Sequence, residues 1–265
     1  MNFKGLLGGL TILCGLSVAC FAREDSQGPH RGLMQAPPLI IDESTALVNS
    51  TEYAQAQLTS ALLNETIATV ILLVHVTIDD IHFSAPLPTI NRTVSIAGNC
   101  DTTDSKCVID GQGLHRLFTV DGPAGRLRLT NLYLTGGFSA ANASTLFVTG
   151  GASGELVDCE VRGGLAGAGG GRRLLEAGAP WGEAQHGGGE GGGIGCLVNG
   201  TLTLQDSLLV NNSANRGGAV AAVGASCTVH LLRVRLESNR ADLGGGVFLG
   251  DGAAGAMEGG AAGGV

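Results

Sequence analysis

The sequence is poor in aromatic and in charged side chains. Aromatic residues make up 4% of the 265 residues, with one Trp and two Tyr, and charged residues make up 14%. A carbohydrate-stacking face needs aromatic platforms, so a dedicated sugar-binding module is poorly supported. The formal net charge of −8 disfavours nucleic acid as a partner, because binding phosphates requires clustered Lys and Arg.

The sequence also lacks a recognisable metal or cofactor motif. Its six histidines form no His-x-x-x-His pair and have no Cys-x-x-Cys partner, so a zinc site has little support. The tract Gly250-x-Gly252-x-x-Gly255 matches a dinucleotide-binding fingerprint. It lies in glycine-rich sequence with no helix pattern after it, so we attribute the match to composition. We therefore expect no cofactor and no bound metal.

Long apolar runs are missing beyond the N-terminus. No later run approaches the ~20 residues that a transmembrane helix needs. Residues 1–22 have the pattern of a signal peptide, with a lysine near the start, an apolar stretch from Leu6 to Ala19 and expected cleavage after Ala22. A lipoprotein signal at Cys20 and a buried N-terminal helix are weaker alternatives. The mature protein is expected to be soluble, with no integral membrane segment, and secreted or held at the cell surface.

Glycine, in contrast, is abundant, with 45 residues, and part of it belongs to a repeat. The segments that begin at Leu209 and at Leu236 share the pattern Leu-x-x-Asn-x-Ala-x-x-Gly-Gly at a spacing of 27 residues. The repeat turn residues are Asn212, Gly217, Gly218, Asn239, Gly244 and Gly245.

Strand patterns follow the same period. Leu129, Leu156, Leu204 and Leu231 are separated by 27, 48 and 27 residues, and 48 is 27 plus an insertion of 21. Around each leucine, apolar residues alternate with polar ones and then change phase, which indicates two short strands joined at a corner. One copy cannot bury its apolar face alone, so copies must stack. The pattern predicts an all-β parallel β-helix of about 27 residues per coil, with the leucines in one inner column and Asn212 beside its counterpart in the next coil.

The paired motifs, leucine-x-x-Asn followed by Gly-Gly-Ala-Val at 217–220, resemble the repeats of the chlamydial polymorphic outer-membrane proteins. Such repeats also occur in secreted right-handed β-helix proteins of the pectin-lyase-like superfamily. The specific match covers 209–247, and looser coil patterns extend over roughly 70–250. Leu209 and Leu236 stand where the family usually has Phe, and no membrane β-barrel follows the repeats, so a complete autotransporter is not expected.

The resemblance implies a right-handed parallel β-helix, here of about six coils. It also implies a structural, adhesive or surface-recognition role. The partners would be glycans or proteins of the cell surface or extracellular space.

The segments before the β-helix have other patterns. Residues 23–49 contain Pro, Ser and Gln without a sustained period and are interpreted as a linker. The pattern of residues 50–68 predicts a short amphipathic helix from Thr51 to about Leu63, with Ser50 as its N-cap. We expect this helix to cap the open N-terminal end of the β-helix, whose first strand edge would otherwise be exposed.

The β-helix itself is expected at residues 69–250. A glycine-rich insertion at about 166–190 is predicted to form a flexible loop, because such sequence buries too little apolar surface to offset the entropy of ordering. Residues 251–265 are again rich in Gly and Ala. They are predicted to form a disordered tail.

Cysteines and glycosylation sequons favour an exported protein. Cys100 and Cys107 bracket a short polar loop and form the predicted disulfide. Cys159 falls in an inward column and is interpreted as a small apolar residue, whereas Cys196 and Cys227 could pair across adjacent coils. Six Asn-x-Ser/Thr sequons are candidates for N-glycosylation, at Asn49, Asn64, Asn91, Asn142, Asn199 and Asn211. Alternatively, Asn, Ser and Thr are simply frequent turn residues.

An enzymatic role is the alternative that the resemblance raises, because pectin-lyase-like lyases and hydrolases cleave polysaccharides. The hydrolases use facing aspartates on neighbouring coils. Here a corner column reads Asn131, Asp158, Asp206 and Arg233, so the two acids could stack about 5 Å apart with a raised pKa. Asp and Asn are also common at corners because they bond their own backbone. We expect no catalytic residue; if the protein is an enzyme, Asp158 and Asp206 are the candidates.

Overall fold

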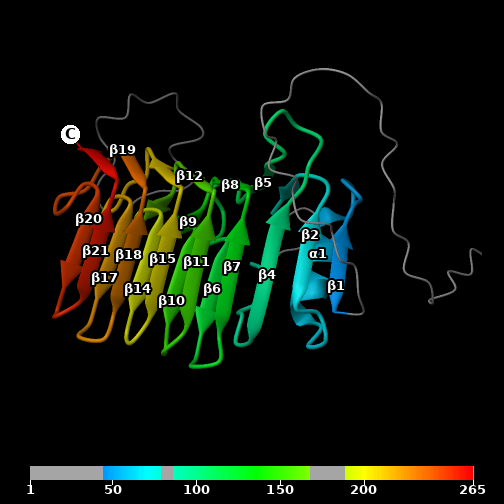
Figure 1. Cartoon of the computed structure of the whole chain (residues 1–265), viewed down its shortest axis with the longest axis horizontal. Helices are drawn as coiled ribbons and strands as arrows, with labels where there is room; N and C mark the ends of the chain where they lie inside the picture. The colour runs from blue at the N-terminus through cyan, green and yellow to red at the C-terminus, as the bar shows by residue number, and fades with distance from the viewer. Residues whose placement is uncertain (1–43, 79–85, 168–188, 265) are drawn as a thin grey trace, which may run out of the picture. The chain divides into compact units, whose positions relative to one another are not determined.

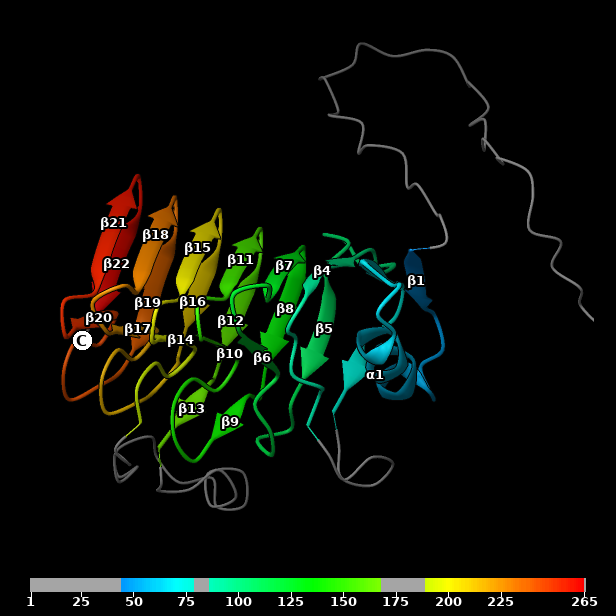
Figure 2. The same cartoon turned by 90° about the horizontal axis from the view of Figure 1, so that it is seen from below.

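The computed structural model of the chain describes residues 44–78, 86–167 and 189–264. These residues form an all-β parallel solenoid of about seven turns, here called coils, with about 27 residues per coil and one short helix near the N-terminus. Figures 1 and 2 show the strands stacked side by side along the solenoid. The predicted fold class is confirmed, with about seven coils in place of six. The predicted signal peptide at 1–22 lies outside the described residues.

A full coil contributes one strand to each of three parallel sheets. Sheet A contains β1 (Thr45–Val48), β2 (Thr69–Leu72), β4 (Thr93–Gly98), β7 (Arg126–Thr130), β11 (Ser153–Val157), β15 (Thr201–Gln205), β18 (Thr228–Leu232) and β21 (Ala254–Glu258). Sheet B contains β3 (Val76–Thr77), β5 (Cys107–Asp110), β8 (Leu132–Thr135), β12 (Glu160–Arg162), β16 (Leu208–Val210), β19 (Arg235–Asn239) and β22 (Ala261–Gly264). Sheet C contains β6 (Phe118–Asp121), β10 (Leu146–Thr149), β14 (Ile194–Leu197), β17 (Val220–Val223) and β20 (Val247–Gly250). A further pair consists of β9 (Phe138–Ser139) and β13 (Leu165–Ala166).

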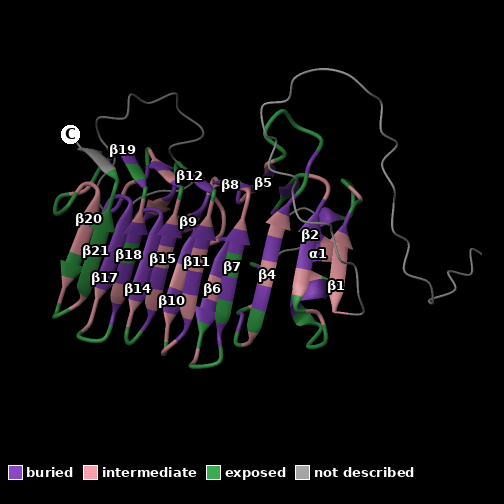
Figure 3. Ribbon diagram, viewed as in Figure 1, coloured by how far each residue is buried: buried purple, intermediate pink, exposed green. Residues whose placement is uncertain are grey.

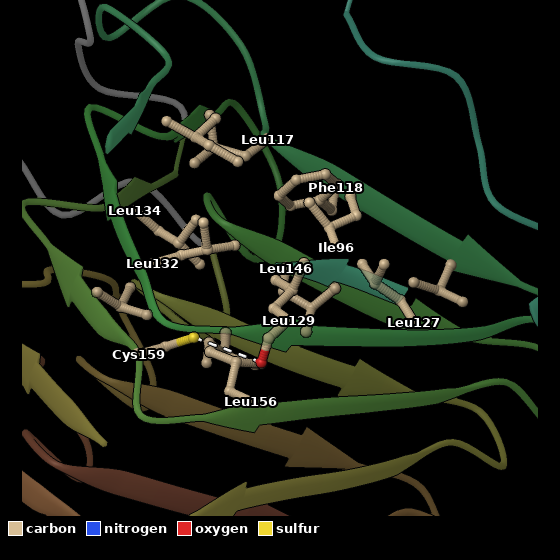
Figure 4. Packing of buried hydrophobic residues seen from close by; sticks show 14 of the residues in the cluster. Ile96, Leu117, Phe118, Leu127, Leu129, Leu132, Leu134, Leu146, Leu156 and Cys159 are labelled. Atoms are coloured by element: carbon tan, nitrogen blue, oxygen red, sulfur yellow. Dashed lines mark hydrogen bonds between the residues drawn. The ribbon is translucent and has the colours of Figure 1, made fainter. Parts of the chain in front are cut away.

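The inner column of leucines has the predicted register. Leu129 pairs with Leu156, Leu156 with Leu204, and Leu204 with Leu231. All four side chains are at most 5% exposed, and Figure 4 shows Leu129 and Leu156 among the other apolar side chains of the interior. Along the strands, buried positions alternate with more exposed ones (Figure 3). Because Leu156 pairs directly with Leu204, the insertion leaves the stacking unchanged; its residues 168–188 lie outside the described part of the chain.

The first coil differs from the prediction. β1 lies within the segment interpreted as a linker at 23–49, and it pairs in parallel with β2, so that interpretation is wrong for this strand. The helix α1 (Ala54–Leu63) starts later than predicted, with Tyr53 as its N-cap. The physical reason is that the Gln57 side chain accepts hydrogen bonds from the backbone N–H groups of Asn49 and Ser50, at 3.1 and 3.2 Å. These bonds hold Ser50 in the connection that precedes the helix.

α1 packs against β1 and β3, and its buried apolar residues join the hydrophobic core. Since β3 is the end strand of sheet B, the helix covers the N-terminal edge of that sheet. The Arg92 guanidinium donates to the carbonyl oxygens of Ala61, Leu62 and Asn64, at 3.2, 3.0 and 2.9 Å. A cation at the C-terminal end of a helix satisfies carbonyl groups that have no partner within the helix.

The C-terminal end also differs from the prediction. The disordered tail expected at 251–265 is wrong for most of its length, because β21 pairs with β18 and β22 pairs with β19. These strands are held by backbone hydrogen bonds to the preceding coil, which do not require apolar side chains. This last coil has less cover than the others, and Leu249 and Met257 are each 42% exposed.

Candidate functional site

A column of corner residues contains the two acids singled out from the sequence. Asn131, Asp158, Asp206 and Arg233 each join a strand of sheet A to a strand of sheet B. Their φ angles lie between 50° and 57°, a left-handed conformation that Asn and Asp tolerate better than most residues. The register of the flanking strands stacks the Asp158 corner on the Asp206 corner. The predicted adjacency of the two acids along the solenoid is therefore present.

Arg233 neutralises Asp206. The Nε and Nη2 atoms of Arg233 donate to Oδ1 and Oδ2 of Asp206, at 2.5 and 2.7 Å. These bonds, together with one from the Gln205 side chain, lower the pKa of Asp206 to about 2. A catalytic acid needs the opposite shift. The raised pKa expected for stacked acids is therefore wrong for Asp206, because the carboxylate interacts with the arginine of the next coil.

Asp158 pairs with a different cation. The Nζ atom of Lys106 lies 2.6 Å from Oδ1 of Asp158 and also donates to the Asp158 carbonyl oxygen. The Asp158 side chain is 60% exposed, so it sits on an open wall rather than in an enclosed cleft of the kind that usually holds reacting groups. The structure brings the two candidate acids onto neighbouring coils, but it gives each of them its own cation.

Lys106 lies in the loop between Cys100 and Cys107. The sequence predicts the disulfide that closes this loop but indicates no role for Lys106. The disulfide between Cys100 and Cys107 closes this loop, with a Cα–Cα distance of 5.2 Å. Tyr133 on sheet B donates its hydroxyl hydrogen to Oδ2 of Asp104 at 2.5 Å. This bond lowers the pKa of Asp104 and raises the pKa of Tyr133. Sequence reasoning missed the cluster, although the paired cysteines and the outward position of Tyr133 were both visible signals.

The repeat asparagines form the predicted stack of amides. The Nδ2 atom of Asn212 donates to Oδ1 of Asn239 at 2.9 Å. The Oδ1 atom of Asn212 accepts the backbone N–H of Gly164 at 2.9 Å, and Nδ2 of Asn239 donates to the Leu209 carbonyl at 2.8 Å. Both side chains are at most 2% exposed. The asparagines thus satisfy buried backbone groups at the turns, which is a structural role.

The sequon asparagines lie at the surface, with one exception. Five of them are exposed, namely Asn49, Asn64, Asn91, Asn199 and Asn211. Asn142 is half-buried, and its Oδ1 atom accepts the backbone N–H of Glu190 at 3.1 Å. Ser144, the hydroxyl residue of that sequon, is fully buried.

The surface also has shallow depressions. One of about 370 Å³ is lined by residues that include Arg116, Phe138 and Ser139. The Arg116 guanidinium faces protein groups there, donating to the Ala143 carbonyl at 2.7 Å and to the Ser139 hydroxyl at 3.0 Å, and burial lowers the pKa of this arginine. A second depression of about 430 Å³ lies beside α1 and β1. Across residues 44–78, 86–167 and 189–264, no group of three or more His, Cys, Asp or Glu could hold a metal ion.

The described residues define the class of the protein as a parallel β-solenoid. Comparison of the chain with protein-family models, with curated proteins and with solved structures found no match. The class therefore follows from the coil register alone. Within the described ranges, none of the helical structure has the length and apolar character to cross a membrane.

Proposed function

We propose that this protein is a secreted or surface-displayed right-handed β-helix with a structural, adhesive or surface-recognition role and no catalytic activity. The proposal includes membership of the pectin-lyase-like superfamily, with repeats like those of the chlamydial polymorphic outer-membrane proteins. Cell-surface or extracellular glycans or proteins are the proposed partners.

The observation that carries the proposal is that polar side chains on the outer walls bond one coil to the next. Outer-wall hydrogen bonds at a separation of 27 residues join Arg126 to Ser153, Arg128 to Glu155, Thr201 to Thr228, Asp206 to Arg233 and Asn215 to Asp242, at 2.5 to 3.1 Å. Each exposed pair contributes little alone, but the repetition favours a scaffold. Side chains used to hold coils together are not poised to transfer protons to a substrate.

The first test is secretion with glycan attachment. The full chain with a C-terminal tag, produced in cultured eukaryotic cells, is expected in the medium or on the cell surface. Its electrophoretic mobility should increase after enzymatic removal of N-glycans. Asn211→Gln should remove one glycan, because Asn211 is exposed. Asn142→Gln is the matched control and should change nothing, because the half-buried Asn142 amide is bonded to Glu190.

A protein retained inside the cells without glycans would contradict the proposed export. A glycan found at Asn142 would contradict the half-buried setting of this sequon.

The alternative function is polysaccharide cleavage, and the stacking of the Asp158 and Asp206 corners is the observation in its favour. We expect no product when the purified protein is incubated with pectin, alginate or related polymers, with or without calcium. The measurement is release of reducing ends for a hydrolase and of unsaturated ends for a lyase.

Cleavage that is lost in both Asp158→Asn and Asp206→Asn would establish the enzyme instead. Glu155→Gln is the matched control, since Glu155 is a partly exposed acid on β11 whose partner is Arg128. It lies outside the corner column and should leave any such activity unchanged.

A further inference from the structure

Two buried cysteines lie on successive coils, close to the corner between sheets C and A. Cys196 is on β14, and Cys227 lies in the connection from β17 to β18, 31 residues later. Both are 0% exposed. Their sulfur atoms are 2.8 Å apart, which is closer than two sulfur atoms settle when they are not bonded to each other. A disulfide requires a distance of about 2.05 Å, so a small displacement joins them.

The residues around the two sulfurs leave room for this contact. In the strand register, Cys196 lies beside Ala222, and the pairing of Thr201 with Thr228 places Gly200 beside Cys227. Each cysteine therefore lies beside a small residue of the neighbouring coil, Ala222 for Cys196 and Gly200 for Cys227. A Cβ atom on Gly200 would lie 2.7 Å from the Cys196 sulfur. Glycine at this position is thus needed for the Cys196 side chain to turn toward Cys227.

Other uses of the pair have less support. A structural zinc site needs four ligands, and the described part of the chain contains no group of three or more ligating side chains. Among the described residues the third free cysteine is Cys159, which is also buried; its sulfur faces the carbonyl oxygens of Leu129 and Val157, at 3.5 and 3.3 Å. Cys159 is therefore the matched control: a buried thiol within the solenoid that faces carbonyl oxygens instead of sulfur.

We propose that Cys196 and Cys227 form a second disulfide, which joins two successive coils from inside the core. Each thiol loses its hydrogen, the S–S bond forms, and two electrons and two protons pass to a disulfide oxidant of the glutathione class, which becomes two thiols. The proposal rests on the proposed export, because such oxidants are maintained in secretory compartments. The bond is a covalent cross-link between the coil that follows the insertion and the next coil. The strand pairing that also joins these two coils is non-covalent.

Burial determines when this bond forms. Removal from water raises the pKa of the Cys196 thiol, and the neighbouring Cys227 raises it further. The thiolate is the species that attacks a disulfide, so exchange is slow once the coil has closed. The bond therefore forms while the coils assemble, and afterwards the core shields it from reductants.

The experiment uses the full chain, reduced, refolded with reduced and oxidised glutathione, unfolded in N-ethylmaleimide and digested with trypsin. Cys14 and Cys20 share the peptide 5–23, and each of the other cysteines then falls on its own peptide: 93–106, 107–116, 129–162, 174–216 and 217–233. Mass spectrometry is expected to find 174–216 joined to 217–233, and 129–162 alkylated at Cys159. Alkylation of both Cys196 and Cys227 would overturn the proposal, whatever the state of the Cys100–Cys107 pair. Refolding does not pass through a cell, so failure of the proposed export would not affect this result.

Variants distinguish the stabilisation that comes from the disulfide from the stabilisation that comes from packing of the cysteine side chains. Cys227→Ala should lower the melting temperature of the oxidised protein by on the order of 10 °C. Alanine fits this position, because Ala253 occupies it on the next coil, as the pairing of Thr228 with Ala254 shows. After reduction, the native protein and Cys227→Ala should melt within a few degrees of each other, whereas an equal gap before and after reduction would assign the loss to packing and overturn the proposal. Cys159→Ala should keep the cross-linked peptide.

Discussion

Gly218→Ala is expected to lower the free energy of unfolding by about 4 kcal/mol or more. A Cβ atom on Gly218 would lie 2.2 Å from the carbonyl oxygen of Gly245, and 2.6 and 2.7 Å from the carbonyl oxygen and the nitrogen of Arg240. All three atoms belong to the backbone of the next coil, so no flexible side chain can move aside. The coils would have to separate locally, breaking hydrogen bonds such as that from Gly218 N–H to the Gly244 carbonyl at 3.1 Å. Urea unfolding followed by circular dichroism measures the loss.

Gly246→Ala is the matched control and should change the free energy of unfolding by less than about 1 kcal/mol. The nearest atom to a Cβ there is the terminal Cδ1 of Leu236, at 3.3 Å. The preceding coil already carries alanine at this position, since the pairing of Val220 with Val247 aligns Ala219 with Gly246. Equal stability of the Gly218 and Gly246 variants would show that the coils do not approach each other as closely as described.

These two positions explain what the glycine pair in the repeat contributes. Gly217 has a φ of 64° and Gly244 a φ of 66°, so the first glycine supplies a left-handed backbone. The second glycine has no Cβ, which allows the backbone of the next coil to approach closely. The sequence pattern marks both positions as turn residues, but only the distances between coils distinguish their roles.

The coil register could be predicted from the sequence because the signal is repeated. Leu129, Leu156, Leu204 and Leu231 each fix the same phase, so an insertion between two of them does not obscure the period. Apolar alternation within each coil then identifies the buried face. Repetition therefore made the fold predictable, even though each single strand is short.

The last coil could not be predicted from its own residues. β21 and β22 consist largely of Gly and Ala, which carry no alternating pattern. Their structure comes from pairing with β18 and β19, and this information resides in the neighbouring coil. Composition alone predicted disorder, whereas the edge of the preceding coil provides the hydrogen-bonding partners.

Of the two cations that pair with the candidate acids, one could be predicted from the repeat and the other could not. The Asp206–Arg233 pair lies at a separation of 27 residues within the column read from the sequence, so it could have been predicted. The Asp158–Lys106 pair spans 52 residues. This pair depends on the position of the loop closed by the Cys100–Cys107 disulfide, and the 27-residue repeat does not predict that position.

Asn212→Ala is expected to lower the free energy of unfolding by about 3–5 kcal/mol. The Asn212 side chain accepts from the Gly164 N–H at 2.9 Å and donates to the Val161 carbonyl at 3.2 Å and to Asn239 Oδ1 at 2.9 Å. Alanine would leave the Gly164 N–H and the Val161 carbonyl without these bonds inside a core that excludes water. A buried polar group that loses its partner costs about 1–3 kcal/mol. Thermal or urea unfolding of protein made without glycans provides the measurement.

Asn211 provides the control, because it has the same side chain as Asn212 but is exposed to solvent. Asn211 is exposed and has a φ of 55°, a conformation that glycine adopts readily, so Asn211→Gly should change stability by less than about 1 kcal/mol. Asn212→Asp keeps the acceptor for Gly164 but places a carboxylate against the Val161 carbonyl and Asn239 Oδ1, so it should destabilise the protein at neutral pH at least as much as Asn212→Ala. If all three variants unfolded alike, the amide stack would contribute nothing to holding the coils together. The coils would then be held together by the leucine columns and by the backbone hydrogen bonds between strands.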